Sequence, residues 1–293
     1  MTEGSNTVSA PAERLAVLGS PIAHSKSPQL HLAAYRALGL DWQYSKAEVA
    51  PGQLSDFVLG LDESWRGLSL TMPLKEEALA LIDSADVQTM LTGAANTITF
   101  AHENGSLAVQ GFNTDVGGIV DALAGTGISR SSEVLILGAG ATARSAVVAA
   151  AELGAEHVTI AARSPEKAEQ VTAVAANAGV AISVVWLADA LAQEVDAPVT
   201  ISTLPGGSLT EADVVGFAPT PGAVLLDVAY DPWPSILATA WRERGGVDVS
   251  GLWMLAHQAL AQVRIFVTGD PQLRLADEPA VFAAMTRAVG LTA

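Results

Sequence analysis

The fold of this chain is decided by the stretch Glu133-Val134-Leu135-Ile136-Leu137-Gly138-Ala139-Gly140-Ala141-Thr142-Ala143. Its first half is short and apolar, as in a buried strand, and a helix that ends near Gly154 is expected to follow the glycines. In dinucleotide-binding folds the first glycine permits a tight bend, the second lets the backbone approach a pyrophosphate, and a small third residue brings helix and strand together. Amides at the helix start then bind the anion. The residues that we predict to bind the cofactor here are Gly138, Ala139, Gly140, Ala141, Thr142 and Ala143. An ordinary strand-to-helix turn is the alternative.

Around this turn, short apolar segments alternate with helical ones, which is typical of a doubly wound parallel sheet. The expected strands are Val134–Leu137, Val158–Ala161, Ile182–Trp186, Val199–Thr203, Val224–Val228 and Val247–Val249. The expected helices are Ala141–Leu153, Glu166–Ala178, Leu191–Val195, Glu211–Val215 and Ile236–Arg242. The second half of the chain is therefore expected to be a Rossmann-type domain.

The first half of the chain shows a similar alternation and then a hairpin. The expected strands are Leu15–Gly19, Trp42–Val49 and Gly67–Thr71, and the expected helices are Pro28–Leu38, Gln53–Leu61 and Lys75–Ile82. Strands at Ala95–Phe100 and Leu107–Gly111 flank Asn104-Gly105, a pair that favours a tight hairpin turn, so we expect a mixed sheet. A helix at Asp115–Leu123 leads into the second domain, and the helices Leu252–Phe266 and Pro279–Val289 are expected to return to the first.

The composition predicts a compact protein of two domains and excludes several kinds of partner. The 293 residues fit two domains of roughly 150 residues, and half of the residues are hydrophobic. With 15 Lys and Arg against 31 Asp and Glu, the net charge of −16 repels nucleic acids and anionic membranes. No apolar run reaches the roughly 18 residues of a membrane span. Residues Met1–Ala12 are polar and are expected to form a loose tail instead of a signal peptide.

The residue types available also limit the chemistry. The absence of cysteine excludes disulfides, thiolate nucleophiles and cysteine metal sites, and it fits a cytoplasmic location. The five histidines are scattered without a paired spacing, so no metal site is predicted. His257 is expected to pack in the protein or face solvent, although it stands beside Gln258.

The end of the strand after the glycine turn indicates which dinucleotide binds. An acidic residue there would accept bonds from a free ribose 2′-hydroxyl, but the sequence is Ala161-Ala162-Arg163-Ser164, with Lys167 one helical turn later. A guanidinium can grip a 2′-phosphate and stack on adenine, so we predict NADP in preference to NAD. Arg163 as a solvent-facing residue at the helix start is the alternative.

Polar groups also gather at four places in the first half where helices begin. Ser25 and Ser27 precede a helix, and Thr71 and Lys75 follow the third strand, where ligands of open α/β sheets bind. An amide, Asn96, and a carboxylate, Asp115, come from Gly93-Ala94-Ala95-Asn96-Thr97 and Gly111-Phe112-Asn113-Thr114-Asp115 in the hairpin region. Each also has a structural interpretation: Ser27 and Asp115 could cap helices, and Lys75 could be a surface lysine.

Together with Gly251-Leu252-Trp253-Met254-Leu255-Ala256-His257-Gln258, these segments resemble the shikimate dehydrogenase family over nearly the whole chain and in the same order. The resemblance implies that Lys75 and Asp115 are the catalytic pair and that Tyr230 lines the cleft. It implies substrate binding by Ser25, Ser27, Thr71, Asn96, Asp115, Tyr230 and Gln258, and further cofactor contacts from Arg163, Ser164, Lys167, Thr203 and Gly251.

The expected fold is thus α/β, with a mixed α/β substrate domain (residues 1–116 and 258–293) and a doubly wound Rossmann-type NADP-binding domain (residues 117–257). The expected activity is the reversible NADPH-dependent reduction of 3-dehydroshikimate to shikimate, by a monomer or a homodimer. The departures from the family lie on the cofactor side: Ala162, Ala141-Thr142-Ala143 and Ser202-Thr203-Leu204-Pro205-Gly206. An NAD-dependent quinate/shikimate dehydrogenase and a non-catalytic shikimate-binding regulator are the alternatives.

Overall fold

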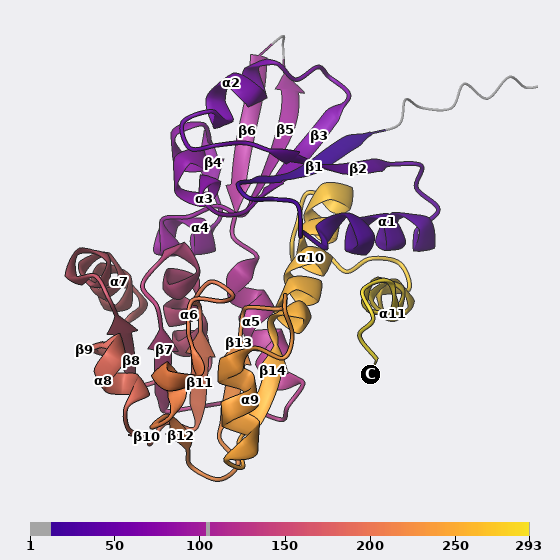
Figure 1. The fold of residues 1–293 in the computed structure, drawn as a ribbon. Coiled ribbons are helices and arrows are strands. Elements are labelled where there is room, and N and C mark those ends of the chain that lie inside the picture. The colour runs from indigo at the N-terminus through magenta and orange to yellow at the C-terminus, as the bar shows by residue number, and fades with distance from the viewer. Residues whose placement is uncertain (1–12, 104–105, 293) are drawn as a thin grey trace, which may run out of the picture.

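The computed structural model describes residues 13–103 and 106–292 and shows two α/β units, each built on a six-stranded sheet (Figure 1). The predicted tail Met1–Ala12 and the predicted turn Asn104-Gly105 lie outside the described residues. Within the described ranges, no helix combines the length and the apolar character needed to cross a membrane.

The first sheet is mixed, as predicted. Its order is β2-β1-β3-β5-β6-β4, in which β1 runs parallel to β2 and β3, while β5 runs antiparallel to β3 and β6. The strands are β1 (Arg14–Gly19), β2 (Gln43–Glu48), β3 (Trp65–Leu70), β4 (Ser84–Ala85), β5 (Thr97–Glu103) and β6 (Ser106–Phe112). The helices are α1 (Ser27–Ala37), α2 (Leu54–Leu59), α3 (Leu74–Glu77) with the 3-10 turn Ala78–Ala80, and α4 (Val87–Thr92).

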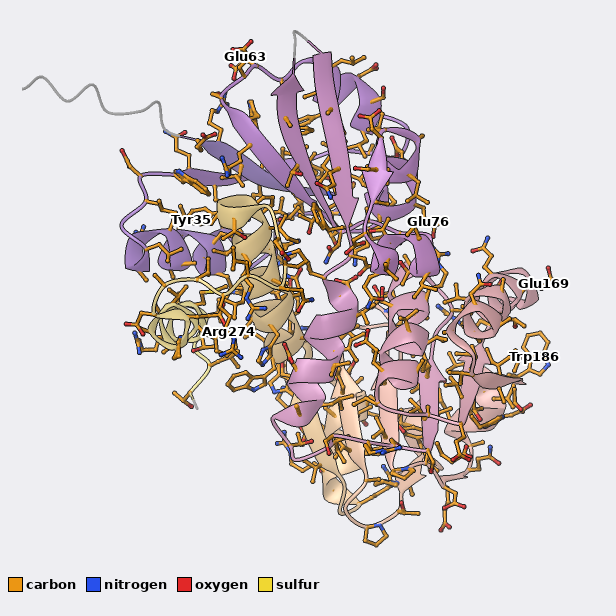
Figure 2. All side chains as sticks on the ribbon, turned by 180° about the vertical axis from the view of Figure 1, so that it is seen from behind. Tyr35, Glu63, Glu76, Glu169, Trp186 and Arg274 are labelled. Carbon is orange, nitrogen blue, oxygen red and sulfur yellow. The ribbon has the colours of Figure 1, made fainter. Side chains whose placement is uncertain are left out.

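The second sheet is doubly wound, as predicted. All its strands are parallel in the order β14-β13-β11-β7-β8-β9, so β9 is an edge strand, from which Trp186 projects (Figure 2). The strands are β7 (Glu133–Leu137), β8 (His157–Ala162), β9 (Ala181–Trp186), β11 (Val199–Ser202), β13 (Val224–Asp227) and β14 (Val247–Ser250). The helices are α6 (Ala141–Glu152), α7 (Pro165–Ala178), α8 (Leu187–Leu191), the 3-10 turn Glu211–Val214 and α9 (Ile236–Glu243).

Alternate residues of β7 build the two layers of this core. Val134 and Ile136 pack with α6, whereas Leu135 and Leu137 belong to a separate buried cluster with Trp241 of α9. A strand buried on both faces has to be continuously apolar, which is why the stretch before Gly138 shows no polar alternation.

Two helices far apart in sequence join the units. The helix α5 (Asp115–Ala124) belongs to the core of the second unit and packs along α10 (Gly251–Thr268), which reaches the first sheet (Figure 1). The helices approach closely at Gly118, where a Cβ atom would lie 2.8 Å from the Cβ of Gln258. The helices α10 and α11 (Glu278–Ala288) then pack on α1 around Phe266 and Met285, which confirms the expected return to the first unit.

Some local predictions were wrong, and some short elements were missed. The helix predicted at Leu191–Val195 instead lies at Leu187–Leu191, because Glu194–Val195 (β10) pairs with Ala218–Pro219 (β12), a contact that the local sequence does not encode. The helix predicted at Lys75–Ile82 is split into α3 and a 3-10 turn. The elements β4 and α4 were missed; Asp86 caps α4 by accepting a hydrogen bond from the Thr89 amide.

Candidate active site

A cavity of about 320 Å³ lies where the first sheet faces α5 and α10. Every substrate residue predicted from the sequence lines it: Ser25, Ser27, Thr71, Lys75, Asn96, Asp115, Tyr230 and Gln258. They come from the loops after β1 and β3, from the starts of α1, α3 and α5, from the residue before β5, from the segment after β13, and from α10. The fold therefore brings the predicted set together in one place.

Lys75 and Asp115 form an ion pair in the wall of this cavity. The Lys75 Nζ atom lies 2.5 Å from the Asp115 Oδ2 atom, and the two side chains are only 12% and 5% exposed. Lys75 is thus not a solvated surface lysine. Asp115 is not a helix cap either, because α5 begins at Asp115 itself and Thr114 occupies the cap position. The pair places an ammonium proton donor at a fixed position in a partly enclosed site.

Asn96 connects the other oxygen of this carboxylate to the helix α10. Its amide nitrogen donates to Asp115 Oδ1 at 2.9 Å and lies 3.2 Å from the Gln258 Oε1 atom. Its own oxygen accepts a bond from the Thr114 amide at 3.0 Å. The bonds hold Asp115 with its Oδ2 directed at Lys75, so the carboxylate is oriented before any ligand binds.

The two serines lie at the beginning of α1. The helix begins at Ser27 with Lys26 at the cap position, so Ser27 does not serve as the N-cap. The Ser25 hydroxyl oxygen instead accepts a bond from the Ser27 amide at 3.3 Å. Ser27 is buried, and both serines line the cavity.

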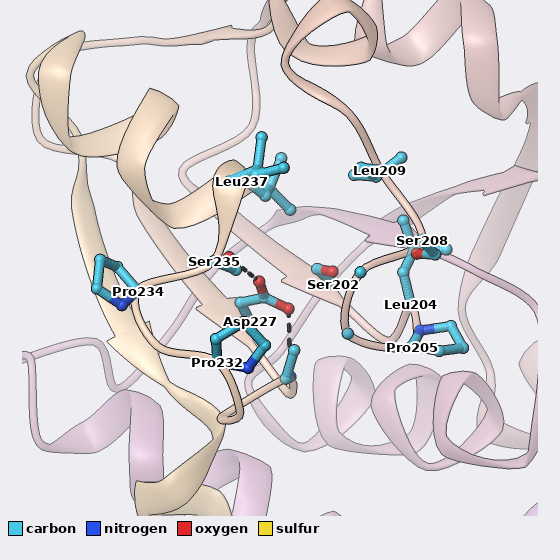
Figure 3. Close-up of a pocket in the computed structure, with 14 residues that line it drawn as sticks. Ser202, Leu204, Pro205, Ser208, Leu209, Asp227, Pro232, Pro234, Ser235 and Leu237 are labelled. Atoms are coloured by element: carbon cyan, nitrogen blue, oxygen red, sulfur yellow. Dashed lines mark hydrogen bonds between the residues drawn. The ribbon is translucent and has the colours of Figure 1, made fainter.

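Tyr230 closes the cavity from the second unit, and a buried carboxylate supports its segment. Asp227, at the end of β13, accepts bonds from the Ser235 hydroxyl at 2.5 Å and from the Ala229 amide at 3.3 Å (Figure 3). Burial raises the pKa of Asp227, although these bonds oppose the shift. Burial also raises the pKa of Tyr230, although the Lys26 backbone opposes the shift.

A second cavity of about 700 Å³ runs along the glycine turn. The residues that line it include Gly138, Ala139, Gly140, Ala141, Thr142, Arg163, Ser164 and Thr203. Gly138 has φ +108°, in the region that favours glycine. A Cβ atom on Gly140 would meet nothing within 4 Å, which leaves the helix start open to a ligand. Ala143 is fully buried and lets α6 pack on the sheet. These features fit a dinucleotide.

The remaining cofactor predictions have different outcomes. Arg163 is exposed at the end of β8 and borders the groove, where the sequence predicted a 2′-phosphate. Lys167 belongs to α7, and its side chain lies outside the described part of the chain. Gly251 borders the substrate cavity instead of the groove, and a Cβ atom there would lie 2.1 Å from the Val228 carbonyl oxygen.

The buried polar residues of the cavity wall that were missed in the sequence are Ser69 and Gln262, and the exposed His24 at its rim was missed as well. Ser69 stands two residues before Thr71 on β3, and Gln262 stands one helical turn after Gln258 on α10. These spacings place each on the same face as a predicted residue and could have identified both. His257 packs on Phe282, with 4.6 Å between the ring centroids, as expected of a packed residue.

The two cavities meet at Thr71, Lys75 and Thr142, which border both. A dinucleotide groove thus opens beside a polar pocket that holds a proton donor, the arrangement of a two-domain oxidoreductase for small polar substrates. Comparisons with known proteins identify the group. The chain belongs to the shikimate dehydrogenase family: residues 17–98 match the shikimate dehydrogenase substrate binding domain, and residues 122–229 match shikimate / quinate 5-dehydrogenase.

Individual relatives agree with this assignment over most of their length. The chain is 35% identical to the shikimate dehydrogenase (NADP(+)) of Methanothermobacter thermautotrophicus, over 89% of this chain and 93% of that protein. The crystal structure of Mycobacterium tuberculosis shikimate dehydrogenase has a TM-score of 0.78 at 40% identity, covering 94% of this chain and 99% of that one. The Thermus thermophilus shikimate 5-dehydrogenase, solved in complex with NADP(H) and shikimate, has a TM-score of 0.75 at 30% identity and the same coverage.

Proposed function

We propose that this protein catalyses the reversible NADPH-dependent reduction of 3-dehydroshikimate to shikimate, with Lys75 and Asp115 as its catalytic residues. The observation that carries the proposal is the 2.5 Å contact between Lys75 Nζ and Asp115 Oδ2 in the cavity next to the glycine groove. The relatives described above, which are NADP-dependent shikimate dehydrogenases, support the choice of substrate and cofactor.

The cofactor would be held by the glycine turn and by Arg163. The amides at the start of α6 and the open space at Gly140 suit a pyrophosphate, and the Arg163 guanidinium suits the 2′-phosphate that distinguishes NADP from NAD. When bound, NADPH supplies the hydride that converts the ketone into an alcohol.

Lys75 completes the reaction at the substrate oxygen. Reduction of a ketone leaves a negative oxygen that has to gain a proton, and the ammonium of Lys75 is the donor at the junction of the two cavities. The Asp115 carboxylate holds the ammonium in place and balances its positive charge, while Asn96 fixes the orientation of that carboxylate. In the oxidation of shikimate the same amine removes the hydroxyl proton.

The other polar residues of the cavity would bind the substrate. Ser25 and Ser27, beside the positive end of α1, suit the carboxylate of shikimate, and Thr71, Asn96, Tyr230 and Gln258 suit its hydroxyl groups. The domain limits 1–116 with 258–293 and 117–257 belong to this proposal, as does the cofactor contact of Gly251. The cytoplasmic location, the absence of nucleic-acid binding and the monomeric or homodimeric state stay predictions.

The test is to incubate the purified protein with 3-dehydroshikimate and NADPH and to identify the product by chromatography. We expect shikimate and NADP to form in equal amounts, and we expect no consumption of NADPH when 3-dehydroshikimate is left out. Tight binding of shikimate in calorimetry without any turnover would favour the alternative, a shikimate-binding regulator, and would contradict the proposal.

A further inference from the structure

A chain of buried hydrogen bonds reaches the substrate cavity from behind, through residues that have no role in the reaction described above. It consists of Tyr35, His31, Gln262, Ser69 and Tyr44, all of them buried. His31 and Tyr44 stack with ring centroids 4.0 Å apart and an interplanar angle of 9°. Of the five residues, Ser69 and Gln262 border the cavity, so the chain ends at the substrate.

The orientation of the Gln262 amide is fixed by its partners. Its nitrogen lies 3.1 Å from the backbone oxygen of Asn96 and 2.9 Å from the Thr97 Oγ1 atom. A backbone carbonyl can only accept a hydrogen bond, so the Gln262 nitrogen has to face it and the Gln262 Oε1 atom has to face the other way. That oxygen lies 2.9 Å from the Ser69 hydroxyl and 3.1 Å from His31 Nε2.

Because Gln262 Oε1 is an acceptor only, both of these neighbours have to donate to it. His31 is buried and its pKa is lowered to about 3, so the ring is neutral near pH 7 and carries its single proton on Nε2. The Nδ1 atom is then free to accept from the Tyr35 hydroxyl, which lies 3.2 Å away. The hydrogen bonds therefore run toward Gln262 Oε1 from both sides, from Tyr35 through His31 and from Tyr44 through Ser69.

The Ser69 hydroxyl can bind a ligand only by accepting a hydrogen bond from it. A serine hydroxyl offers one proton and two acceptor positions. The proton is committed to Gln262, and the Tyr44 hydroxyl donates to Ser69 at 2.7 Å, which takes one acceptor position. The remaining lone pair can accept a bond from a hydroxyl, but Ser69 has no proton to offer a carboxylate or a ketone.

We infer that Ser69 is a specificity-determining contact which accepts a hydrogen bond from one substrate hydroxyl, and that Gln262 and His31 are positioning residues which hold it in this acceptor state. The inference rests on the proposed function in naming shikimate as the substrate. The hydroxyl concerned is one of the two that are not oxidised, because Lys75 serves the third.

The test compares shikimate with its two monodeoxy analogues, each lacking one of those two hydroxyls, in the wild type and in three variants. Dissociation constants are measured by calorimetry without cofactor, and kcat and KM are measured with NADP. The variants are Ser69→Ala, Gln262→Met and, as a matched control, Thr97→Val, which removes an acceptor of the same Gln262 amide on the side away from the cavity.

We expect the wild type to bind shikimate about ten-fold more tightly than one of the two analogues, since a site that bonds a hydroxyl rejects the ligand that lacks it. Ser69→Ala should abolish this preference by raising KM for shikimate, with kcat and the affinity for that analogue unchanged. Gln262→Met releases the Ser69 proton and should weaken the preference. Thr97→Val should lower the thermal midpoint and keep the preference.

Three results would overturn the inference. The first is a wild type that binds both analogues as tightly as shikimate, which decides the matter even if no turnover is found. The second is an unchanged preference in folded Ser69→Ala, which alone suffices if Gln262→Met does not fold. The third is an equal loss of preference in Gln262→Met and Thr97→Val, which would mean a structural role only. A wild type that discriminates without turnover would contradict the proposed function and leave the role of Ser69 supported.

Discussion

Gly138 and Thr203 approach each other so closely that a Cβ atom on Gly138 would lie 2.5 Å from the Thr203 Oγ1 atom. Thr203 cannot easily withdraw, because its hydroxyl donates to the Leu137 carbonyl at 2.9 Å and its amide bonds the same oxygen. The glycine turn is therefore constrained by the fold at Gly138, whereas Gly140 has open space around it.

This difference predicts separate consequences for two alanine substitutions. Gly138→Ala should lower the free energy of unfolding by about 2 kcal/mol or more, because φ is +108° and the new methyl group collides with Thr203. Gly140→Ala should change stability by less than about 0.5 kcal/mol and still weaken NADPH binding, because the methyl group occupies the place of the pyrophosphate. Denaturation and calorimetric titration measure both effects. Normal NADPH affinity in Gly140→Ala would show that the cofactor pyrophosphate does not bind at this turn.

Replacing either residue of the proposed catalytic pair, Lys75 or Asp115, should abolish most of the turnover. We expect Lys75→Ala to lower kcat by about 10²–10⁴-fold in a protein that still folds and binds shikimate, since the proton donor acts in the reaction. Asp115→Asn should also lower kcat strongly. The matched control is Asp121→Asn on the same helix, where the carboxylate is exposed. Lys75→Ala with near-normal kcat would remove Lys75 from the mechanism.

Arg163→Ala should reduce the preference for NADP over NAD. Loss of a charged bond to the 2′-phosphate is expected to raise KM for NADPH by about 10- to 100-fold and to leave KM for NADH unchanged, since NADH has no phosphate there. Arg274→Ala, at an exposed side chain of the C-terminal region, is the control for a simple change in net charge. If Arg163→Ala affects both cofactors equally, the guanidinium contacts a part that they share.

His31 predicts a pH dependence of stability with a definite sign. Burial lowers its pKa from 6.5 to about 3, so between these values the unfolded chain takes up a proton that the folded protein refuses. Stability is therefore lost as the pH falls through this window, by up to about 1.4 kcal/mol per pH unit from this group. The free energy of unfolding of the wild type relative to His31→Gln, measured by denaturant titration, should fall from pH 7 to pH 4. A constant difference would show that the His31 ring takes up its proton equally readily in the folded and the unfolded chain.

The sequence contained much of the fold because its decisive features are local. The strand before Gly138 and the helix after Gly140 are encoded by adjacent residues, and the predicted NADP groove follows from that turn. Most of the predicted substrate residues stand near a strand end or a helix start, where side chains point into the crevice of an open sheet. Tyr230 and Gln258 were instead predicted from the resemblance to the family.

What escaped prediction depends on contacts between distant segments. The pairing of Glu194 with Ala218 replaced a predicted helix, and Gln262 bonds Ser69 across 193 residues of sequence. The helical period alone places Gln262 next to Gln258. It does not reveal that the Asn96 carbonyl fixes the orientation of the Gln262 side-chain amide. Hydrogen-bond direction is a property of the assembled site.

The central claim is that this protein is an NADP-dependent shikimate dehydrogenase, and one set of steady-state measurements tests it most directly. The rates of oxidation of shikimate and of quinate are compared, each with NADP and with NAD. We predict the highest kcat/KM for shikimate with NADP, because the groove presents Arg163 where an NAD-specific enzyme would present an acid. A higher kcat/KM for quinate with NAD would contradict the account.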